Sequence, residues 1–182
     1  MTILLTPRLR LEPLTEAHFD GLHRLNNDPE VMRYITGKPD TPEDTQLMID
    51  RVKEKWAEWG YSWWAFIELA TGELIGAGCI QHLGRVRSGP LEIGWRLRLD
   101  RWHQGFASEA AQRMADFAFE DLQAVQLCAV RVAENLASGK VMDRLGMHYT
   151  GIEHWYDKDL ARHDMSRDDW LAARKLRVGT VR

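Results

Sequence analysis

The sequence predicts one domain of mixed α and β structure, in which a central sheet of about seven strands, mostly antiparallel, is flanked by helices. Short apolar runs such as residues 74–80 have the length and composition of buried strands. Between such runs lie stretches whose apolar residues recur at steps of three and four, as in amphipathic helices. In the middle of the chain a strand, a helix and a strand follow one another, which predicts a parallel crossover within the mixed sheet.

Composition sets the class of protein. With 182 residues, 45% of them hydrophobic and 28% charged, residues 1–182 fit a single domain, able to bury roughly 70% of its unfolded surface. A net charge of -3 and a pI near 6.2 argue against binding of nucleic acid by counterion release. No signal peptide or membrane span is expected, because every apolar run is too short. Cys79 and Cys128 lie in apolar runs without metal-site or disulfide spacing, so we expect buried thiols and a cytoplasmic protein.

The first half of the chain predicts a strand followed by three helices. Residues 8–11 alternate arginine with leucine, as in a half-buried strand. Each helix start has a capping residue, and the second and third also have proline at the first helical position. The three caps are Thr15, Asp28 and Thr41. The third helix continues to Gly60, a glycine that favours a helix end.

The second half predicts strands with two interspersed helices. A turn at residues 71–72 joins two strand-like runs into a hairpin. An alanine-rich helix begins near residue 105, and a shorter helix covers residues 137–145. A polar, tail-like end is expected after residue 166. The predicted strands of this half are residues 64–69, 74–80, 91–97, 126–132, 149–156 and 162–166.

The turn between the strand at residues 91–97 and the alanine-rich helix predicts a phosphate-binding cradle. Gly105 and Ala107 are small, so the backbone there can pass close to a ligand. The helix that follows offers unpaired N–H groups and the positive end of its dipole, which suit an anionic pyrophosphate. Taken alone, a glycine and an alanine at this spacing fit an ordinary helix start equally well.

Residues 92–109 as a whole resemble the acyl-CoA-binding motif of the GNAT N-acetyltransferases, and most of all the RimJ/RimL-like branch of ribosomal-protein N-terminal acetyltransferases. Four residues match that branch: Trp102, Gly105, Ala107 and Glu109. Leu99 and His103 depart from it, at positions where proline and glycine are common, and neither change is expected to remove a small residue that the backbone requires.

The resemblance extends over essentially the whole chain, including residues 6–11 and 28–34. It implies the GNAT acyl-CoA N-acyltransferase fold, acetyl-CoA as cosubstrate, no metal, and a homodimer as a common assembly. Asn135 would contact the pantetheine or adenylate arm, and the backbone near Leu97 would pair with pantetheine. The pyrophosphate would be held by the backbone amides of His103, Gln104, Gly105, Phe106 and Ala107.

Asn135 and Ser138 form the second motif that supports this resemblance. An asparagine followed three residues later by serine is also a good helix cap, so a purely structural role is the alternative. Many members of the superfamily place a proton-donating tyrosine a few residues after the asparagine, where this chain has Met142. Because methionine cannot donate a proton, Ser138 is the candidate to hydrogen-bond the CoA sulfur.

Glu92 is the leading candidate for the base that deprotonates the acceptor amine. Related enzymes often hold a carboxylate at this place that relays a proton through water, and burial would raise its pKa toward the working range. The alternative is a strand carboxylate paired with a nearby arginine. Weaker candidates are His82, Glu153 and His154, since a lone strand histidine is more often structural.

The acceptor is predicted from the energetics of deprotonation. An α-amino group with a pKa of about 8 costs roughly 1.4 kcal/mol to deprotonate at pH 7, whereas a lysine costs about 4.6 kcal/mol. A protein or peptide N-terminus is therefore the first prediction, reached by direct transfer in a ternary complex without an acyl-enzyme. Two alternatives remain open. One is a small amine such as a polyamine, aminoglycoside or amino acid; the other, motivated by Met142, is a non-catalytic acetyl-CoA sensor.

Tryptophans and acids near the expected acceptor side complete the candidates. The resemblance implies that some tryptophans line the acceptor pocket, although filling the core is the commoner role of each. The tryptophans in question are Trp63, Trp64, Trp95 and Trp155. Acids at residues 157–159 and 164–169 would attract a cationic acceptor, or form a solvated face.

Overall fold

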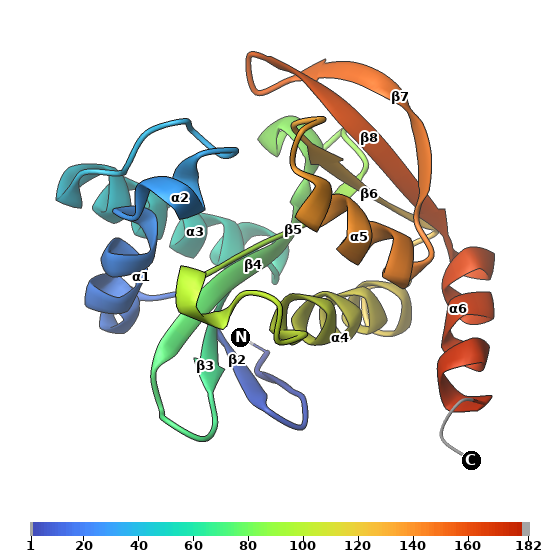
Figure 1. Cartoon of the computed structure of the whole chain (residues 1–182), viewed down its shortest axis with the longest axis horizontal. Coiled ribbons are helices and arrows are strands. Elements are labelled where there is room, and N and C mark those ends of the chain that lie inside the picture. Colours follow the sequence, from blue (N-terminus) through green and yellow to red (C-terminus); the bar gives the residue numbers. More distant parts are fainter. Residues whose placement is uncertain (1, 180–182) are drawn as a thin grey trace.

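The computed structural model describes residues 2–179 as a twisted sheet with helices on both faces (Figure 1). The strands are β1 (Leu4–Leu5), β2 (Leu9–Pro13), β3 (Trp63–Glu68), β4 (Leu74–His82), β5 (Leu91–Leu97), β6 (Gln126–Arg131), β7 (His148–Trp155) and β8 (Lys158–Ser166). The α-helices are α1 (Phe19–Asn26), α2 (Pro29–Met32), α3 (Pro42–Trp59), α4 (Phe106–Glu120), α5 (Leu136–Leu145) and α6 (Arg167–Gly179). Short 3-10 turns occupy Glu16–His18, Leu83–Arg85 and Leu99–Arg101.

The sheet has the order β1-β2-β3-β4-β5-β6-β8-β7, and every neighbouring pair except β5–β6 is antiparallel. This confirms the predicted mixed sheet, its β3–β4 hairpin and the parallel crossover through α4. The two-residue strand β1, which pairs Leu4 with Leu11, adds an eighth strand to the predicted set.

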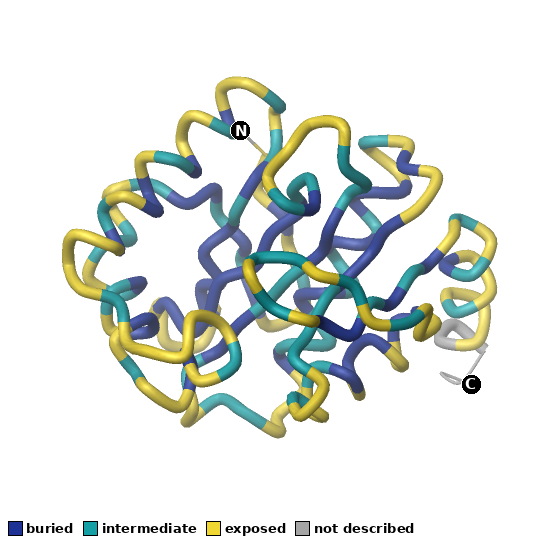
Figure 2. The backbone as a smooth tube through the Cα atoms, turned by 90° about the horizontal axis from the view of Figure 1, so that it is seen from above, coloured by how far each residue is buried: buried dark blue, intermediate teal, exposed yellow. Residues whose placement is uncertain are grey.

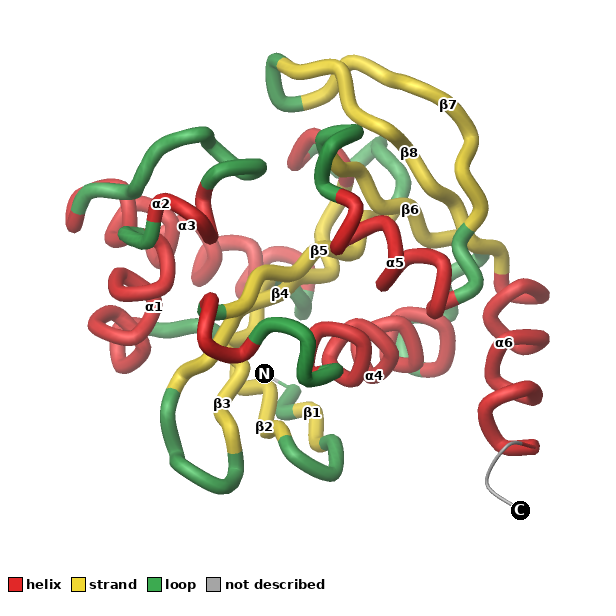
Figure 3. Tube along the Cα trace, viewed as in Figure 1, coloured by secondary structure: helices red, strands yellow, loops and turns green. Residues whose placement is uncertain are grey.

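Helices cover the two faces of the sheet. Figures 1 and 3 show α1, α2 and α3 together on one side of β4 and β5, and α4 and α5 on the other. Side-chain contacts agree, because Met114 of α4 faces Gly78 while Met48 of α3 faces Arg96. The strands between them are the most buried part of the chain, as Figure 2 shows.

The side chains of β5 alternate between the two faces of the sheet. In a strand, successive side chains point to opposite faces. Trp95 therefore lies on the α4 face, whereas Glu92, Gly94 and Arg96 lie on the α3 face. The base candidate and Arg96 thus share one face of one strand.

β5 and β6 pair in register at one position, Glu92 with Cys128. Beyond it, β5 continues to Leu97 paired only with β4 on its other side. The chain enters α4 from the end of β5 and α5 from the end of β6, so the starts of both helices lie where the two strands diverge. This divergence is the opening in which the site is built.

Helix ends follow the predicted caps. The Asp28 carboxylate accepts from the backbone N–H groups of α2, and Thr41 and Asp44 form a reciprocal capping box at α3. Gly60 ends α3 in the left-handed conformation, with φ of 80°. The helix predicted after Thr15 begins with a 3-10 turn before α1.

The expectation of a tail-like end after residue 166 is wrong, because residues 167–179 form α6. Trp170 anchors this helix: it stacks on Phe119, and its indole N–H donates to Asp116 at 2.8 Å. One buried aromatic side chain among charged neighbours gave too little periodicity to be recognised in the sequence. None of the helices within residues 2–179 is both long and apolar enough to cross a membrane.

Candidate active site

The cradle lies in the turn between β5 and α4. Gly105 precedes α4 with φ of 84°, a left-handed conformation that glycine adopts without steric cost. Within the described chain no side chain caps this helix start, so the N–H groups of its first turn are available to a ligand. These features fit an anionic phosphate group, as the sequence predicted.

His103 also adopts a left-handed conformation, with φ of 60°. Glycine adopts this conformation without steric cost, so the histidine at this position carries backbone strain that a glycine would not. Left-handed residues in a turn help to direct neighbouring N–H groups toward one point, as in backbone anion sites.

The N-terminal segment holds the cradle in place. Glu109, one turn into α4, accepts from Arg8 Nε at 2.7 Å, the Arg8 backbone N–H at 2.9 Å and the Thr6 hydroxyl at 2.6 Å. Arg8 in turn donates to the Gln104 carbonyl and lies over the Phe106 ring, 4.2 Å from its centroid. These contacts explain why the motif at residues 92–109 occurs together with the opening at residues 6–11.

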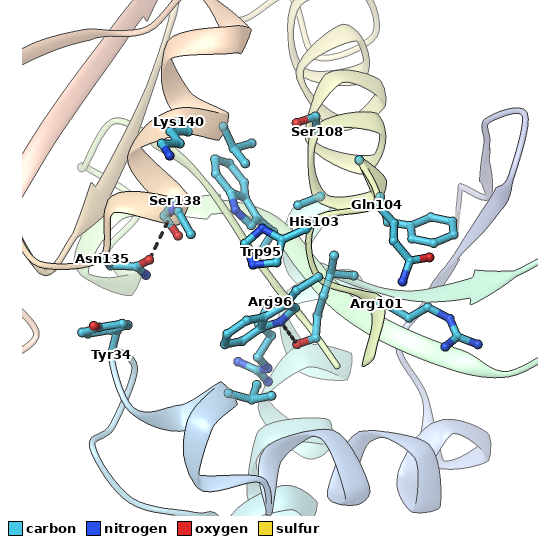
Figure 4. Close-up of a pocket in the computed structure, with 18 of the residues that line it drawn as sticks. Tyr34, Trp95, Arg96, Arg101, His103, Gln104, Ser108, Asn135, Ser138 and Lys140 are labelled. Carbon is cyan, nitrogen blue, oxygen red and sulfur yellow. Dashed lines mark hydrogen bonds between the residues drawn. The ribbon is translucent and has the colours of Figure 1, made fainter. Parts of the chain in front are cut away.

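A cavity of about 880 Å³ joins the cradle to α5, β5 and the α2 segment (Figure 4). Figure 4 shows Asn135, Ser138 and Lys140 along one wall, with Ser108 and Gln104 at the α4 end. The predicted ligand-binding residues all line it: Leu97, His103, Gln104, Gly105, Phe106, Ala107 and Asn135. Ser138 lines it as well, whereas Glu92 does not.

Asn135 and Ser138 form the predicted helix cap and also line the cavity. Asn135 caps α5 by accepting from the Ser138 backbone N–H at 3.2 Å. Both residues nevertheless line the cavity, so the cap itself fixes their position at its wall. Met142, in the place of the family's tyrosine, is 2% exposed in the core and is not part of the cavity lining.

The free edge of β5 is presented by its odd-numbered residues. Arg98 donates its backbone N–H to Ile75 of β4, so by alternation Trp95 and Leu97 present their backbone groups to the opposite edge. The Leu97 carbonyl is engaged by the Trp102 indole at 2.9 Å. A ligand that pairs with this edge would therefore use the Leu97 N–H and the backbone of Trp95.

Glu92 lies on the α3 face of β5 and is 7% exposed. Its carboxylate accepts from the Tyr156 hydroxyl at 2.6 Å and from Gln81 Nε2 at 2.9 Å. Burial raises the pKa of Glu92, while both hydrogen bonds favour the charged form. It makes no ion pair with an arginine in the described chain; Arg85 acts on it only from a distance.

Tyr156 is a site residue that sequence reasoning missed. It occupies the two-residue turn between β7 and β8, where Tyr156 and Asp157 both have positive φ, of 54° and 59°. Tyrosine is strained in this conformation, and the turn carries its hydroxyl to Glu92 and to the Gly84 N–H. Only the pairing of distant strands reveals this contact. The one signal in the sequence is the turn itself, where a bulky tyrosine stands at a position that usually has glycine or asparagine.

Cationic side chains at the cavity were also missed. Arg101 pairs with Glu68, and Arg144 donates to Ser108 Oγ at 3.4 Å. Together with Lys140 they give the cradle end a positive character suited to phosphate groups. Arginines and lysines on helix surfaces carry no distinguishing pattern in the sequence.

The weaker base candidates have structural partners. His82 contacts the Tyr61 hydroxyl at 3.0 Å and the Gly89 carbonyl at 2.8 Å. Glu153 accepts from the Trp155 indole, which lowers its pKa, and pairs with Arg162. His154 pairs with Asp159 at the surface.

Of the tryptophans named from the sequence, some lie in the core and one lines the cavity, while the acids make local contacts. Trp64 is fully buried in the core, while Trp95 lines the cavity. Trp63 donates to Gln81 at 3.1 Å and Trp155 to Glu153. The acids form local contacts, as Asp164 pairs with Arg162.

Both cysteines are free thiols in buried strands. Burial raises the pKa of Cys128 to about 12 and raises that of Cys79 well above its ordinary value, so neither is a ready nucleophile. Within residues 2–179 there is no cluster of three or more histidine, cysteine or acidic side chains suited to a metal ion.

Comparison with known proteins identifies the class. Residues 8–148 match the family model described as an acetyltransferase (GNAT) domain, and this chain belongs to that family. It is therefore a GNAT N-acetyltransferase, a class of enzymes that use acetyl-CoA.

Individual relatives agree at the level of the family. The chain is 31% identical to an uncharacterized N-acetyltransferase p20 of Bacillus licheniformis, covering 89% of this chain and 91% of that protein. It is 28% identical to the FsC-acetyl coenzyme A-N(2)-transacetylase of Aspergillus fumigatus, over 93% and 78% of the two chains.

Solved structures agree on the fold. An acetyltransferase from Agrobacterium tumefaciens matches with a TM-score of 0.80 and 26% identity, over 92% of this chain and 95% of that one. The ribosomal-protein-S5-alanine acetyltransferase from Vibrio fischeri matches with a TM-score of 0.76 and 15% identity, over 93% and 99%. At that identity the second likeness concerns the fold alone.

Proposed function

We propose that this protein acetylates a primary amine by direct transfer within a ternary complex, and that the amine is a protein or peptide N-terminus. The observation that carries the proposal is a single cavity that unites the cradle at Gly105 with Ser138 where β5 and β6 diverge. Acetyl-CoA, when bound, supplies the activated acetyl group. The backbone amides of residues 103–107, Leu97 and Asn135 would hold it, and Lys140 and Arg144 would add positive charge.

Two side chains carry the proton chemistry in this proposal. Glu92 takes the proton of the acceptor amine through water, since it lies beyond the cavity lining and its pKa is raised by burial. Tyr156 and Gln81 fix the carboxylate in position. The Ser138 hydroxyl hydrogen-bonds the sulfur that leaves, in place of the tyrosine that this chain lacks at Met142. No acyl-enzyme is formed, because both thiols are buried.

A small amine is the second candidate acceptor. It is favoured by the relative from Aspergillus fumigatus, whose name describes transfer to an N(2) position of FsC, and by the aromatic wall that Tyr34, Trp95 and Trp102 give the cavity. The RimJ/RimL-like assignment, the cytoplasmic location and the homodimer remain part of the proposal. Gel filtration at several concentrations tests the last of these.

A thiol-release assay with acetyl-CoA tests the proposal. The acceptors are peptides with free Ser, Ala or Met N-termini, polyamines, aminoglycosides and free amino acids, with products confirmed by mass spectrometry. Acetylated peptide N-termini are the expected result, and acetylated small amines would favour the second candidate. In Ser138→Ala we expect kcat to fall about tenfold without a change in the KM for the amine, as for loss of a hydrogen bond to a charged group. Saturable acetyl-CoA binding without any transfer would favour the sensor and contradict the proposal.

A further inference from the structure

Arg96 is a buried arginine whose charge has no matching carboxylate beside it. The side chain is 8% exposed, its Nε is buried without a hydrogen-bond partner, and Nη2 reaches only the Met48 sulfur at 3.0 Å. The guanidinium lies over the Trp63 ring, 4.8 Å from its centroid. Its immediate neighbours are thus a thioether and an aromatic face, which are weak partners for a cation.

The charged groups around Arg96 do not neutralise its positive charge. It makes no ion pair within residues 2–179; Asp40 attracts it from a distance, and Arg51 repels it. Arg51 is itself repelled by Arg85. By contrast, Arg8 pairs with Glu109 and Arg162 pairs with Glu153 and Asp164. A buried guanidinium is costly unless an anion accepts its hydrogen bonds, so this site lacks an anion.

Arg96 faces the same cavity as Ser138. It lines the cavity, and Figure 4 shows it on the side where Tyr34 lies, away from Ser108 at the α4 end. This position separates it from the cradle where phosphate groups would bind. The free N–H groups of Arg96 therefore belong to the acceptor end.

The geometry also connects Arg96 to the base candidate. Arg96 and Glu92 lie on the same face of β5, with Cα atoms about 13 Å apart at the usual rise per residue. Between them stands Gly94, whose missing side chain leaves that face open; an added Cβ would meet only the Cys79 sulfur, at 3.4 Å. Gln81 bridges Glu92 and the Trp63 indole, and Trp63 carries the Arg96 guanidinium.

We propose that Arg96 binds a carboxylate of the acceptor, so that the preferred substrates among the amines are those that carry a carboxylate near the amino group. The inference rests on the proposed function and deepens it. Free amino acids and peptides with an acidic first residue satisfy this chemistry. Polyamines and aminoglycosides do not, because their positive charges would face the Arg96 guanidinium, which Arg51 already repels from a distance.

Matched acceptors that differ only in the carboxylate test the inference. Thiol release is measured for L-alanine, L-leucine and L-serine against their amides, and for tetrapeptides that begin with Asp or with Asn. A bidentate, charge-assisted contact predicts that kcat/KM is at least about tenfold higher for the carboxylate member. The amino-acid pairs and the peptide pair then distinguish the source of the carboxylate.

Variants at Arg96 assign the preference. Arg96→Leu should make kcat/KM equal for the two members of each pair, because it lowers kcat/KM only for the member with the carboxylate. The KM for acetyl-CoA should be unchanged. This variant should fold, because an apolar residue replaces an unpaired buried charge; thermal unfolding checks this. Arg96→Lys should retain part of the preference. The matched control is Arg98→Leu, which removes the next arginine on this face, one already paired with Glu73 and Asp100; it should keep the full preference.

A binding experiment separates failure of this inference from failure of the proposed function. With CoA present, calorimetry compares N-acetyl-L-alanine with N-acetyl-L-alaninamide in the wild type and in Arg96→Leu. The inference is supported when the wild type binds the carboxylate ligand more tightly than the amide and Arg96→Leu abolishes this difference. That holds even when no amine is acetylated. Absence of acetylation would contradict only the proposed function. Equal binding and equal turnover of both members, a preference that survives Arg96→Leu, or a raised KM for acetyl-CoA in that variant would overturn the inference.

Discussion

The two ends of the cavity are built in different ways. The cradle end consists of backbone: a turn with two left-handed residues and an uncapped helix start, held within a short stretch from His103 to Ala107. The other end, where we propose that the acceptor binds, consists of side chains from segments far apart in the chain, among them Tyr34 after α2 and Arg96 of β5. A local backbone motif can bind a constant group such as pyrophosphate, while dispersed side chains can vary with the acceptor.

The largest expected effect concerns Glu92, the proposed base, which lies beyond the cavity lining. Glu92→Gln keeps the size of the side chain but removes the base, so kcat should fall about 100-fold while acetyl-CoA binding is retained. Because the base acts when deprotonated and its pKa is raised by burial, wild-type activity should fall with decreasing pH above the range of an ordinary glutamate. Steady-state rates across pH measure both effects. A variant with wild-type kcat would remove Glu92 from the mechanism.

The second prediction breaks the cradle end. Gly105→Ala places a Cβ on a left-handed residue, 3.4 Å from Arg8 Nη2, and should weaken acetyl-CoA binding about tenfold as the turn strains. Isothermal calorimetry measures the Kd. Gly60→Ala is the control: it introduces the same backbone strain at the end of α3, with φ of 80° and no atom near the new Cβ. Similar losses of affinity in both variants would mean that global stability, not the cradle, is responsible.

The cradle could be predicted from the sequence more completely than the rest of the site. The cradle and the α5 cap could be predicted because their residues are neighbours along the chain, as with Asn135 and Ser138. Glu92 was found by resemblance, but its partners Tyr156 and Gln81 come from other strands, and no local pattern announces them. Arg96 was not distinguishable from Arg98 in the sequence, although one is buried and unpaired and the other forms surface ion pairs.

The sheet shows the same limit. Strand periodicity and the turn at residues 71–72 predicted the β3–β4 hairpin, whereas the short strand β1 and helix α6 depend on contacts that only the folded chain supplies. The residue at position 103 is a further case, because the backbone conformation there follows from the turn and not from the histidine.

The third prediction sharpens the role of Tyr156. Its hydroxyl stabilises the charged form of Glu92, so Tyr156→Phe should raise the Glu92 pKa and move the acid limb of the kcat/KM profile upward by about one pH unit. A purely structural tyrosine would change stability without moving the limb. Tyr149→Phe, an exposed tyrosine on β7, is the control and should leave the profile unchanged.

The smallest expected effect concerns the strained turn. His103→Gly relieves a left-handed histidine at the cost of a more flexible unfolded chain, so the free energy of unfolding should rise by about 0.5 kcal/mol. Urea denaturation measures the change. A loss of stability would instead show that the imidazole makes a contact worth more than the strain.

The division of the cavity into two independent ends is tested most directly by a double-mutant cycle of Gly105→Ala and Arg96→Leu. The measurement is the KM for acetyl-CoA and the kcat/KM for a carboxylate-bearing amine in the wild type, both single variants and the double variant. We expect Gly105→Ala to raise only the first quantity, Arg96→Leu to lower only the second at saturating acetyl-CoA, and the two effects to multiply within about twofold. A rise in the KM for acetyl-CoA in Arg96→Leu, or strong coupling between the variants, would contradict the account.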